Sequence, residues 1–134
     1  MKRKQKGFSL LEVMIAVAIV GIVGAIALGA FQRNVFEGNR TDGIALLSSI
    51  SQILERCYTK YGTYSNAACP AIGLDQDSEN GFYNVTVAGV TATTYTLTAT
   101  ALGAQANDTE CENLTLDQTG QQGITGTGTV ADCW

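Results

Sequence analysis

A continuous apolar run close to the N-terminus constrains the fold of this chain more than any other feature. From Phe8 to Phe31 the only ionisable side chain is that of Glu12. As an α-helix these residues would extend about 36 Å, which is enough to cross a bilayer. A carboxylate within such a segment is costly and usually functional. The run therefore predicts a membrane-spanning helix over residues 8–31 in which Glu12 has a specific role.

The charges on either side of the run predict its orientation. Four of the eight basic residues lie within the first six positions, which by the positive-inside rule keeps the N-terminus in the cytoplasm. The rest of the chain is then expected outside. Without those six residues, 4 basic residues stand against 12 acidic ones, a net charge of −8. Such a surface repels polyanions, so no direct nucleic-acid binding is expected.

The cysteines agree with an exported domain, since all four lie beyond the apolar run. They are Cys57, Cys69, Cys111 and Cys133. The chain has no histidine and no CxxC spacing, which makes zinc and redox roles weak hypotheses. Four cysteines allow three disulfide pairings. We favour the local one, Cys57 with Cys69 and Cys111 with Cys133, because each bond would close a loop worth about 3 kcal/mol in the chain-entropy model.

Two ordinary interpretations of the N-terminus compete with a functional helix. One is a secretory signal peptide cleaved after Ala27, which would release a soluble binding protein; the other is a plain uncleaved anchor. The length of the apolar run, the acid at Glu12 and the helical pattern that follows argue against both.

Residues 6–12, KGFSLLE, resemble the cleavage and methylation motif of type IV prepilins and related pseudopilins. The resemblance implies that residues 1–7 are a leader peptide. A prepilin peptidase would cut between Gly7 and Phe8 and methylate the new amine of Phe8. In pilins the carboxylate equivalent to Glu12 is thought to meet the N-terminus of a neighbouring subunit, so the resemblance assigns Glu12 to subunit assembly.

Small residues on the same apolar segment provide a candidate packing face. Gly21, Ala25 and Gly29 recur every four residues, a spacing that lets helices approach closely. The alternative is that small residues are simply common in membrane helices. Many pilins have proline where Gly29 stands. Glycine costs about 1 kcal/mol in a helix interior, which predicts a point at which the helix can melt locally.

Beyond the membrane segment the pattern predicts an amphipathic helix and then strands. An apolar face continues to about residue 58, with Gly38 and Gly43 as weak points, and is formed by Ile44, Leu47, Ile50, Leu54 and Cys57. We interpret Arg40 and Asp42 as a solvated surface pair. Residues 59–81 are expected to be a loop. Period-two alternation then predicts strands over 82–87, 94–100 and 113–118, with a turn near Gly89 and a possible fourth strand over 127–131.

Two further blocks resemble PilE-type minor pilins of the type IVa class. One is residues 40–64; the other combines TYTLTATAL, DTECENLTLDQTG and the terminal Cys-Trp. The resemblance implies a pilin fold of the α+β class, in which a long N-terminal helix packs on a three- or four-stranded antiparallel sheet. The globular domain would be residues 32–134, with the sheet and a disulfide-bonded C-terminal loop, the D-region of pilins, in 82–134.

The expected function is that of a structural subunit, with no enzymatic activity and no cofactor. The chain lacks histidine, a nucleophile motif and a phosphate-binding glycine loop. The acidic stretch 75–81 has its glycine one place late for a calcium loop. We expect a minor pilin that waits in the inner membrane and then joins other pilin subunits in an extracellular filament for motility, adhesion or DNA uptake. A major pilin and a type II secretion pseudopilin are the alternatives.

Overall fold

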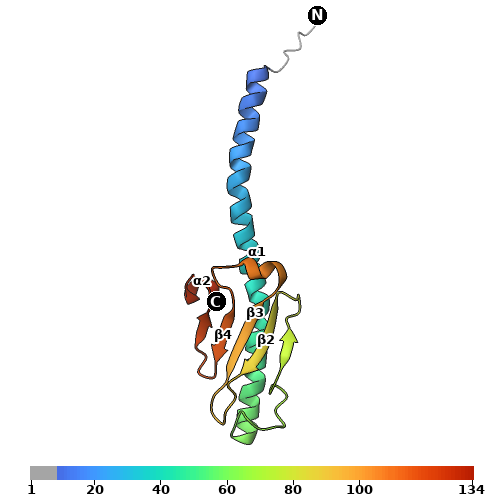
Figure 1. The fold of residues 1–134 in the computed structure, drawn as a ribbon, viewed down its shortest axis with the longest axis vertical. Helices are drawn as coiled ribbons and strands as arrows, with labels where there is room; N and C mark the ends of the chain where they lie inside the picture. The colour runs from blue at the N-terminus through green and yellow to red at the C-terminus, as the bar shows by residue number, and fades with distance from the viewer. Residues whose placement is uncertain (1–8) are drawn as a thin grey trace, which may run out of the picture. The chain divides into compact units, whose positions relative to one another are not determined.

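A computed structural model describes residues 9–134 of the chain (Figure 1). The long helix α1 (Leu10–Tyr61) is followed by a five-stranded sheet, a 3₁₀ helix η1 (Gly103–Asn107) and a short C-terminal helix α2 (Val130–Cys133). The strands are β1 (Asp75–Asp77), β2 (Tyr83–Ala88), β3 (Thr96–Ala101), β4 (Leu114–Asp117) and β5 (Gln122–Ile124). A boundary between two units falls between Val35 and Phe36.

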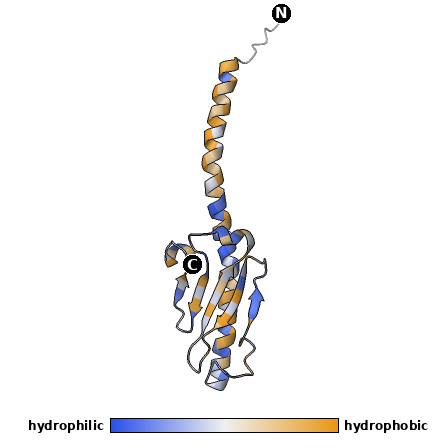
Figure 2. Ribbon diagram, in the orientation of Figure 1, coloured by the Kyte–Doolittle hydropathy of each residue, from blue (hydrophilic) through white to orange (hydrophobic). Residues whose placement is uncertain are grey.

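The first part of α1, residues 10–35, has no buried side chain. Figure 2 shows that this part is hydrophobic along nearly its whole length. It is long and apolar enough to cross a membrane. The helix continues without a break through Gly29, because one glycine weakens a helix by only about 1 kcal/mol.

The second part of α1, residues 36–61, buries one face. The buried positions recur at intervals of three and four, and are Arg40, Gly43, Leu47, Ile50, Leu54 and Cys57. The helix passes through Gly38 and Gly43 without interruption and ends at Tyr61, three residues later than predicted. Gly62 closes it: its φ is +71° and its amide donates to the carbonyl of Tyr58 at 2.8 Å.

The sheet is an antiparallel meander in the order β1-β2-β3-β4-β5. The predicted alternation is confirmed, because Tyr83 and Val85 of β2 and Leu97 and Ala99 of β3 are buried while the threonines of β3 are not. The α+β fold is therefore confirmed, with five strands in place of three or four.

Two local predictions were wrong. Residues 75–77 form β1 inside the predicted loop, and α2 occupies part of the possible strand over 127–131. All three residues of β1 are exposed, so this edge strand has no apolar alternation to reveal it. Its two aspartates also discourage further strands from pairing at that edge.

The core of the unit 36–134 lies between the buried face of α1 and one face of the sheet. In Figure 1 the sheet covers this part of the helix. Leu47, Ile50 and Leu54 are at most 1% exposed. Full burial of one such side chain is worth about 1.5–3 kcal/mol. This part of the helix is thus fixed by residues of its own chain.

Candidate functional site

Glu12 lies in the first turn of α1, where a carboxylate interacts favourably with the helix dipole. Its side chain borders a surface hollow of about 430 Å³ whose other walls are apolar, formed by Val13, Ala16, Val17 and Val20. The expected cleavage and methylation site, Gly7 and Phe8, lies outside the described residues.

The three small residues of the predicted packing face lie in the same exposed segment. A methyl group added at Gly21 or Gly29 would meet nothing within 4 Å, and Ala25 is exposed. Positions four residues apart share one side of a helix. This side of α1 is therefore free, within the described residues, for the close approach of a second helix.

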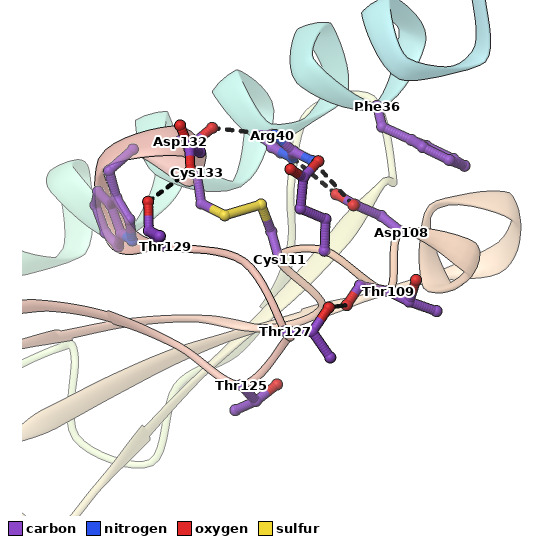
Figure 3. Close-up of a disulfide and its surroundings, with 12 residues drawn as sticks. Phe36, Arg40, Asp108, Thr109, Cys111, Thr125, Thr127, Thr129, Asp132 and Cys133 are labelled. Atoms are coloured by element: carbon purple, nitrogen blue, oxygen red, sulfur yellow. Dashed lines mark hydrogen bonds and ion pairs between the residues drawn. A yellow bond between two sulfur atoms is a disulfide. The ribbon is translucent and has the colours of Figure 1, made fainter. Parts of the chain in front are cut away.

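In the unit 36–134 the buried guanidinium of Arg40 makes four hydrogen bonds (Figure 3). Its Nε and Nη2 donate to the two carboxylate oxygens of Asp108, at 2.8 and 2.9 Å. Nη2 also reaches Glu110 at 3.3 Å, and Nη1 donates to the carbonyl of Asp132 at 3.2 Å. Arg40 is 3% exposed and Asp108 2%. The hydrogen bond to Asp108 is the main cause that raises the pKa of Arg40.

The prediction of a solvated Arg40–Asp42 pair was wrong. Asp42 instead accepts hydrogen bonds from the backbone and the side-chain amide of Asn80, the latter at 3.0 Å. Arg40 lies on the buried face of α1 because it is in phase with Gly43 and Leu47. The carboxylate 68 residues later in the chain makes its burial possible.

A buried amide extends this cluster to the sheet. The Gln105 side chain donates to the hydroxyl of Tyr83 at 3.1 Å and to Asp108 at 3.2 Å, and accepts from Asn39 at 3.0 Å. Burial raises the pKa of the Tyr83 hydroxyl. Among the described residues no buried side-chain polar atom lacks a hydrogen bond. The cluster thus connects α1, η1 and β2 through satisfied polar contacts.

Two disulfides hold irregular segments in place. One fixes the loop that follows α1, and the other fixes the segment that precedes β4. Cys57 is bonded to Cys69, and Cys111 to Cys133, each with Cα atoms 5.7 Å apart. The second bond lies directly beside Arg40 in Figure 3 and anchors α2. The indole of Trp134 then donates to the carbonyl of Gly123 at 3.1 Å, so the chain end lies along β5.

A cluster of tyrosines lies at the end of the core beside the last turns of α1. The hydroxyls of Tyr64 and Tyr95 both donate to Glu55, at 2.8 and 3.2 Å, and their rings meet edge to face. Burial is the main cause that raises the pKa of both hydroxyls. The hydrogen bond to Glu55 adds to the effect at Tyr64.

The unit 36–134 is strongly acidic. It contains 11 acidic residues and 3 basic ones, which gives a net charge of −8. Arg40 is buried, so Arg56 and Lys60 are its two exposed cations. No cluster of three or more metal-ligating side chains occurs within residues 9–134. The carboxylates of Asp75 and Asp77 in the former calcium candidate both accept from Asn84.

The architecture matches solved pilins. A type IV pilin from Shewanella oneidensis superposes with a TM-score of 0.53 at 26% identity, over 74% of this chain and 97% of that one. The Neisseria meningitidis non-core minor pilin PilV gives 0.51 at 24% identity, over 74% and 92% of the two chains. The long helix, the antiparallel sheet and the disulfide-bonded C-terminal region thus define the type IV pilin fold.

The family described as type IV minor pilin ComP, DNA uptake sequence receptor, matches residues 29–115, and the prokaryotic N-terminal methylation motif matches residues 2–28. Because the first match covers well over half of the chain, the chain belongs to that family of type IV pilins.

Two curated relatives are similar over much of the chain. Fimbrial protein EcpC of Eikenella corrodens is 32% identical over 75% of this chain, and the major pilin PilE of Neisseria gonorrhoeae 32% over 62%. The chain spans 65% and 50% of their respective lengths.

Sequence reasoning missed the residues that surround Arg40. Asp108, Gln105 and Glu110 come from a segment without periodicity, and no local pattern pairs them with a residue on α1. One signal was available: Arg40 is in phase with the apolar face of α1, and a buried cation requires a carboxylate elsewhere in the chain.

Proposed function

We propose that the mature chain is a minor subunit of a type IV pilus. A prepilin peptidase would remove residues 1–7 by cleavage between Gly7 and Phe8 and would methylate Phe8. The proposal is carried by one observation: residues 10–35 of α1 are an exposed apolar helix that overlaps the matched methylation motif, residues 2–28, in a chain with the pilin fold. Such a surface needs lipid or other helices to cover it.

Before assembly the chain would span the inner membrane once, with its N-terminus in the cytoplasm. It would then enter an extracellular filament whose core is formed by these helices. We expect neither catalysis nor a cofactor, because the family is structural. Head-to-tail association of this kind gives open filaments.

Glu12 would set the register between subunits. After cleavage it is the fifth residue of a helix that starts with the amine of Phe8, and its carboxylate would meet the amine of a neighbouring subunit. Opposite charges about 4 Å apart attract by about 4 kcal/mol at an effective dielectric of 20, which offsets the burial of the acid. Gly21, Ala25 and Gly29 would form the face along which adjacent helices approach.

Mass spectrometry of sheared filaments tests this function. We expect the chain in the filament fraction, with methylated Phe8 as its first residue and in low copy relative to the major pilin. A chain that starts after Ala27 in the soluble fraction would instead be an exported binding protein. A methylated chain found with a type II secretion complex, and absent from pili, would be a pseudopilin.

The description of the matched family suggests direct DNA reception as a second function. The surface of the unit 36–134 opposes it. A DNA-binding protein neutralises phosphates with Lys and Arg side chains, and this unit exposes two cations amid a net charge of −8. We propose that the filament supports DNA uptake through another subunit, and that this chain does not hold duplex DNA by itself.

Gel-shift titration of the full-length chain in detergent with duplex DNA tests this proposal. We expect no shift at physiological salt, whatever the DNA sequence. A complex that weakens steeply between about 50 and 200 mM salt would contradict it, because that slope reports several phosphate contacts.

A further inference from the structure

A hollow of about 330 Å³ lies between the last turns of α1 and the loop that follows the helix. Its walls are mainly apolar, and include Ile53 and Tyr61 of the helix and Ala68 and Pro70 of the loop. We call it the Tyr61 hollow. Ligand pockets in proteins usually have volumes of about 300–1,000 Å³, so this hollow is large enough for a small ligand.

Covalent and backbone bonds hold the walls of the Tyr61 hollow in place. Cys57 of the helix also lines it and is bonded to Cys69 of the loop, with the Cα atoms 5.7 Å apart. The helix ends where the amide of Gly62 donates to the carbonyl of Tyr58. In the loop, the ring of Pro70 restricts the backbone. The hollow is therefore formed before a ligand arrives, and binding does not have to order it.

Two cations line the same hollow. Arg56 and Lys60 are the exposed basic residues of the unit 36–134, whose net charge is −8. Positions four residues apart share one side of a helix, so the two charges flank one region. Lys60 Nζ lies 4.9 Å from the centre of the Tyr61 ring. Within residues 9–134 neither cation is paired with a carboxylate.

The neighbouring acid on the helix, Glu55, is held on another side. Its carboxylate accepts hydrogen bonds from the hydroxyls of Tyr64 and Tyr95, at 2.8 and 3.2 Å, and both tyrosines belong to the core. Consecutive residues point about 100° apart around a helix, which separates Glu55 from Arg56. The Tyr61 hollow thus combines apolar walls with two cations whose charge is free to attract an anion.

We infer that the Tyr61 hollow binds a small carboxylate with a compact apolar body, the class to which arylcarboxylates belong. The apolar body would cover Ile53, Tyr61 and Pro70, which are partly exposed to water. The carboxylate would meet Arg56 and Lys60, since a guanidinium offers two parallel N–H donors that match a carboxylate. The inference goes beyond the proposed function, because it concerns the unit 36–134 whether or not the chain enters a pilus.

Both halves of the hollow restrict the ligand. A simple ion such as acetate has no apolar body to cover the walls, and an aryl alcohol has no charge for the cations. A nucleic acid would bring a row of phosphates against a unit with net charge −8, whereas a single carboxylate requires only the two cations. A free monocarboxylate therefore fits the hollow better than a polyanion does.

Nuclear magnetic resonance of Lys60 in the full-length chain in detergent tests the inference. Reductive methylation with isotope-labelled formaldehyde marks the lysines and keeps their charge. The other three lysines lie within the first six residues, and Lys60→Arg assigns the Lys60 signal by removing it. We expect naphthoate to shift this signal saturably, with half-saturation at or below about 1 mM. Acetate and naphthalenemethanol should give no saturable shift.

Substitutions sharpen the test. Arg56→Gln should raise the half-saturating concentration about fivefold, because it removes one charged partner of the carboxylate. Gln76→Glu on β1 is the matched control: it changes the net charge by the same amount far from the hollow in sequence and should have no effect. Ala68→Glu places a carboxylate in the hollow and should abolish the shift. Detergent takes up the same share of naphthoate in each titration, so ratios between variants are unaffected.

The inference is overturned if acetate shifts Lys60 as naphthoate does, because the hollow is then a simple ion contact. An equal shift by naphthalenemethanol overturns it as well, since the cations then have no part in binding. A Lys60 signal that responds to duplex DNA or to a glutamate-rich peptide, but not to naphthoate, assigns the hollow to a macromolecule and also overturns it. Absence of the chain from pili would overturn the proposed function alone.

Discussion

The two parts of helix α1 have the same backbone conformation but differ in the burial of their side chains. In residues 36–61 every third or fourth side chain is buried against the chain's own sheet and loops, whereas in residues 10–35 no side chain is buried. Helix propensity does not explain the difference, since both parts form one continuous helix. What differs is the source of the partner, which is the chain's own sheet and loops for the second part and, in the function proposed above, another subunit or lipid for the first.

This difference implies separate effects of mutation. Changes in the unit 36–134 should alter its free energy of unfolding, which the fluorescence of Trp134 can report because it is the only tryptophan and is hydrogen-bonded to Gly123. Changes in residues 10–35 should leave that value unchanged and alter assembly. The following predictions test this separation in the full-length chain in detergent.

Arg40→Ala should have the largest effect, a loss of about 3–5 kcal/mol in unfolding free energy. The substitution leaves the carboxylate of Asp108 buried and without its cation. Denaturant unfolding followed by Trp134 fluorescence measures it. Combining Arg40→Met with Asp108→Leu removes both charges and should recover most of the loss. If Arg40→Ala unfolds within about 1 kcal/mol of the wild type, the cluster does not hold α1 in place.

Removal of either disulfide should cost about 3 kcal/mol, since the two loops span 12 and 22 residues. The Cys111→Ser/Cys133→Ser chain should also expose Trp134, because the bond anchors the C-terminal helix. Its emission should shift to the red before global unfolding begins. The Cys57→Ser/Cys69→Ser chain is the matched control, with a similar loss of stability and no early shift.

Gly43→Ala should destabilise the unit by about 1–3 kcal/mol through overpacking. A methyl group there would lie 2.8 Å from two ring atoms of Tyr83. Gly38→Ala is the control on the same helix, because a methyl group at Gly38 meets nothing within 4 Å. It should stabilise the helix by about 0.5–1 kcal/mol. Equal effects of the two substitutions would mean that α1 does not contact β2 at Gly43.

The smallest of these effects concerns a single tyrosine, Tyr64, at alkaline pH. Burial raises the pKa of Tyr64, Tyr83 and Tyr95 above the ordinary value of 10.0. The folded chain therefore retains protons that the unfolded chain releases, so stability is complete below pH 10 and falls as the pH rises above it. Each tyrosine contributes at most about 1.4 kcal/mol per pH unit. Circular dichroism of Tyr64→Phe should show a shallower decline than that of the wild type.

The elements that could be predicted from sequence are those whose apolar residues recur at a regular spacing. Intervals of three and four along α1 and of two along β2 and β3 reflect faces that meet one core, so the α+β fold followed from them. β1 escaped prediction because it pairs on one side and buries nothing. Arg40 escaped because its partner Asp108 is supplied by tertiary structure, 68 residues away.

The most direct test of an external partner for the first part of α1 is the assembly of a Glu12→Gln chain. Glutamine keeps the shape of the side chain but cannot neutralise a neighbouring amine. The amount of this variant in sheared filaments, relative to the amount in membranes, should fall at least about tenfold, since about 4 kcal/mol of attraction is removed. Its Trp134 unfolding curve should remain that of the wild type. A Glu12→Gln chain that enters filaments as efficiently as the wild type would contradict this account.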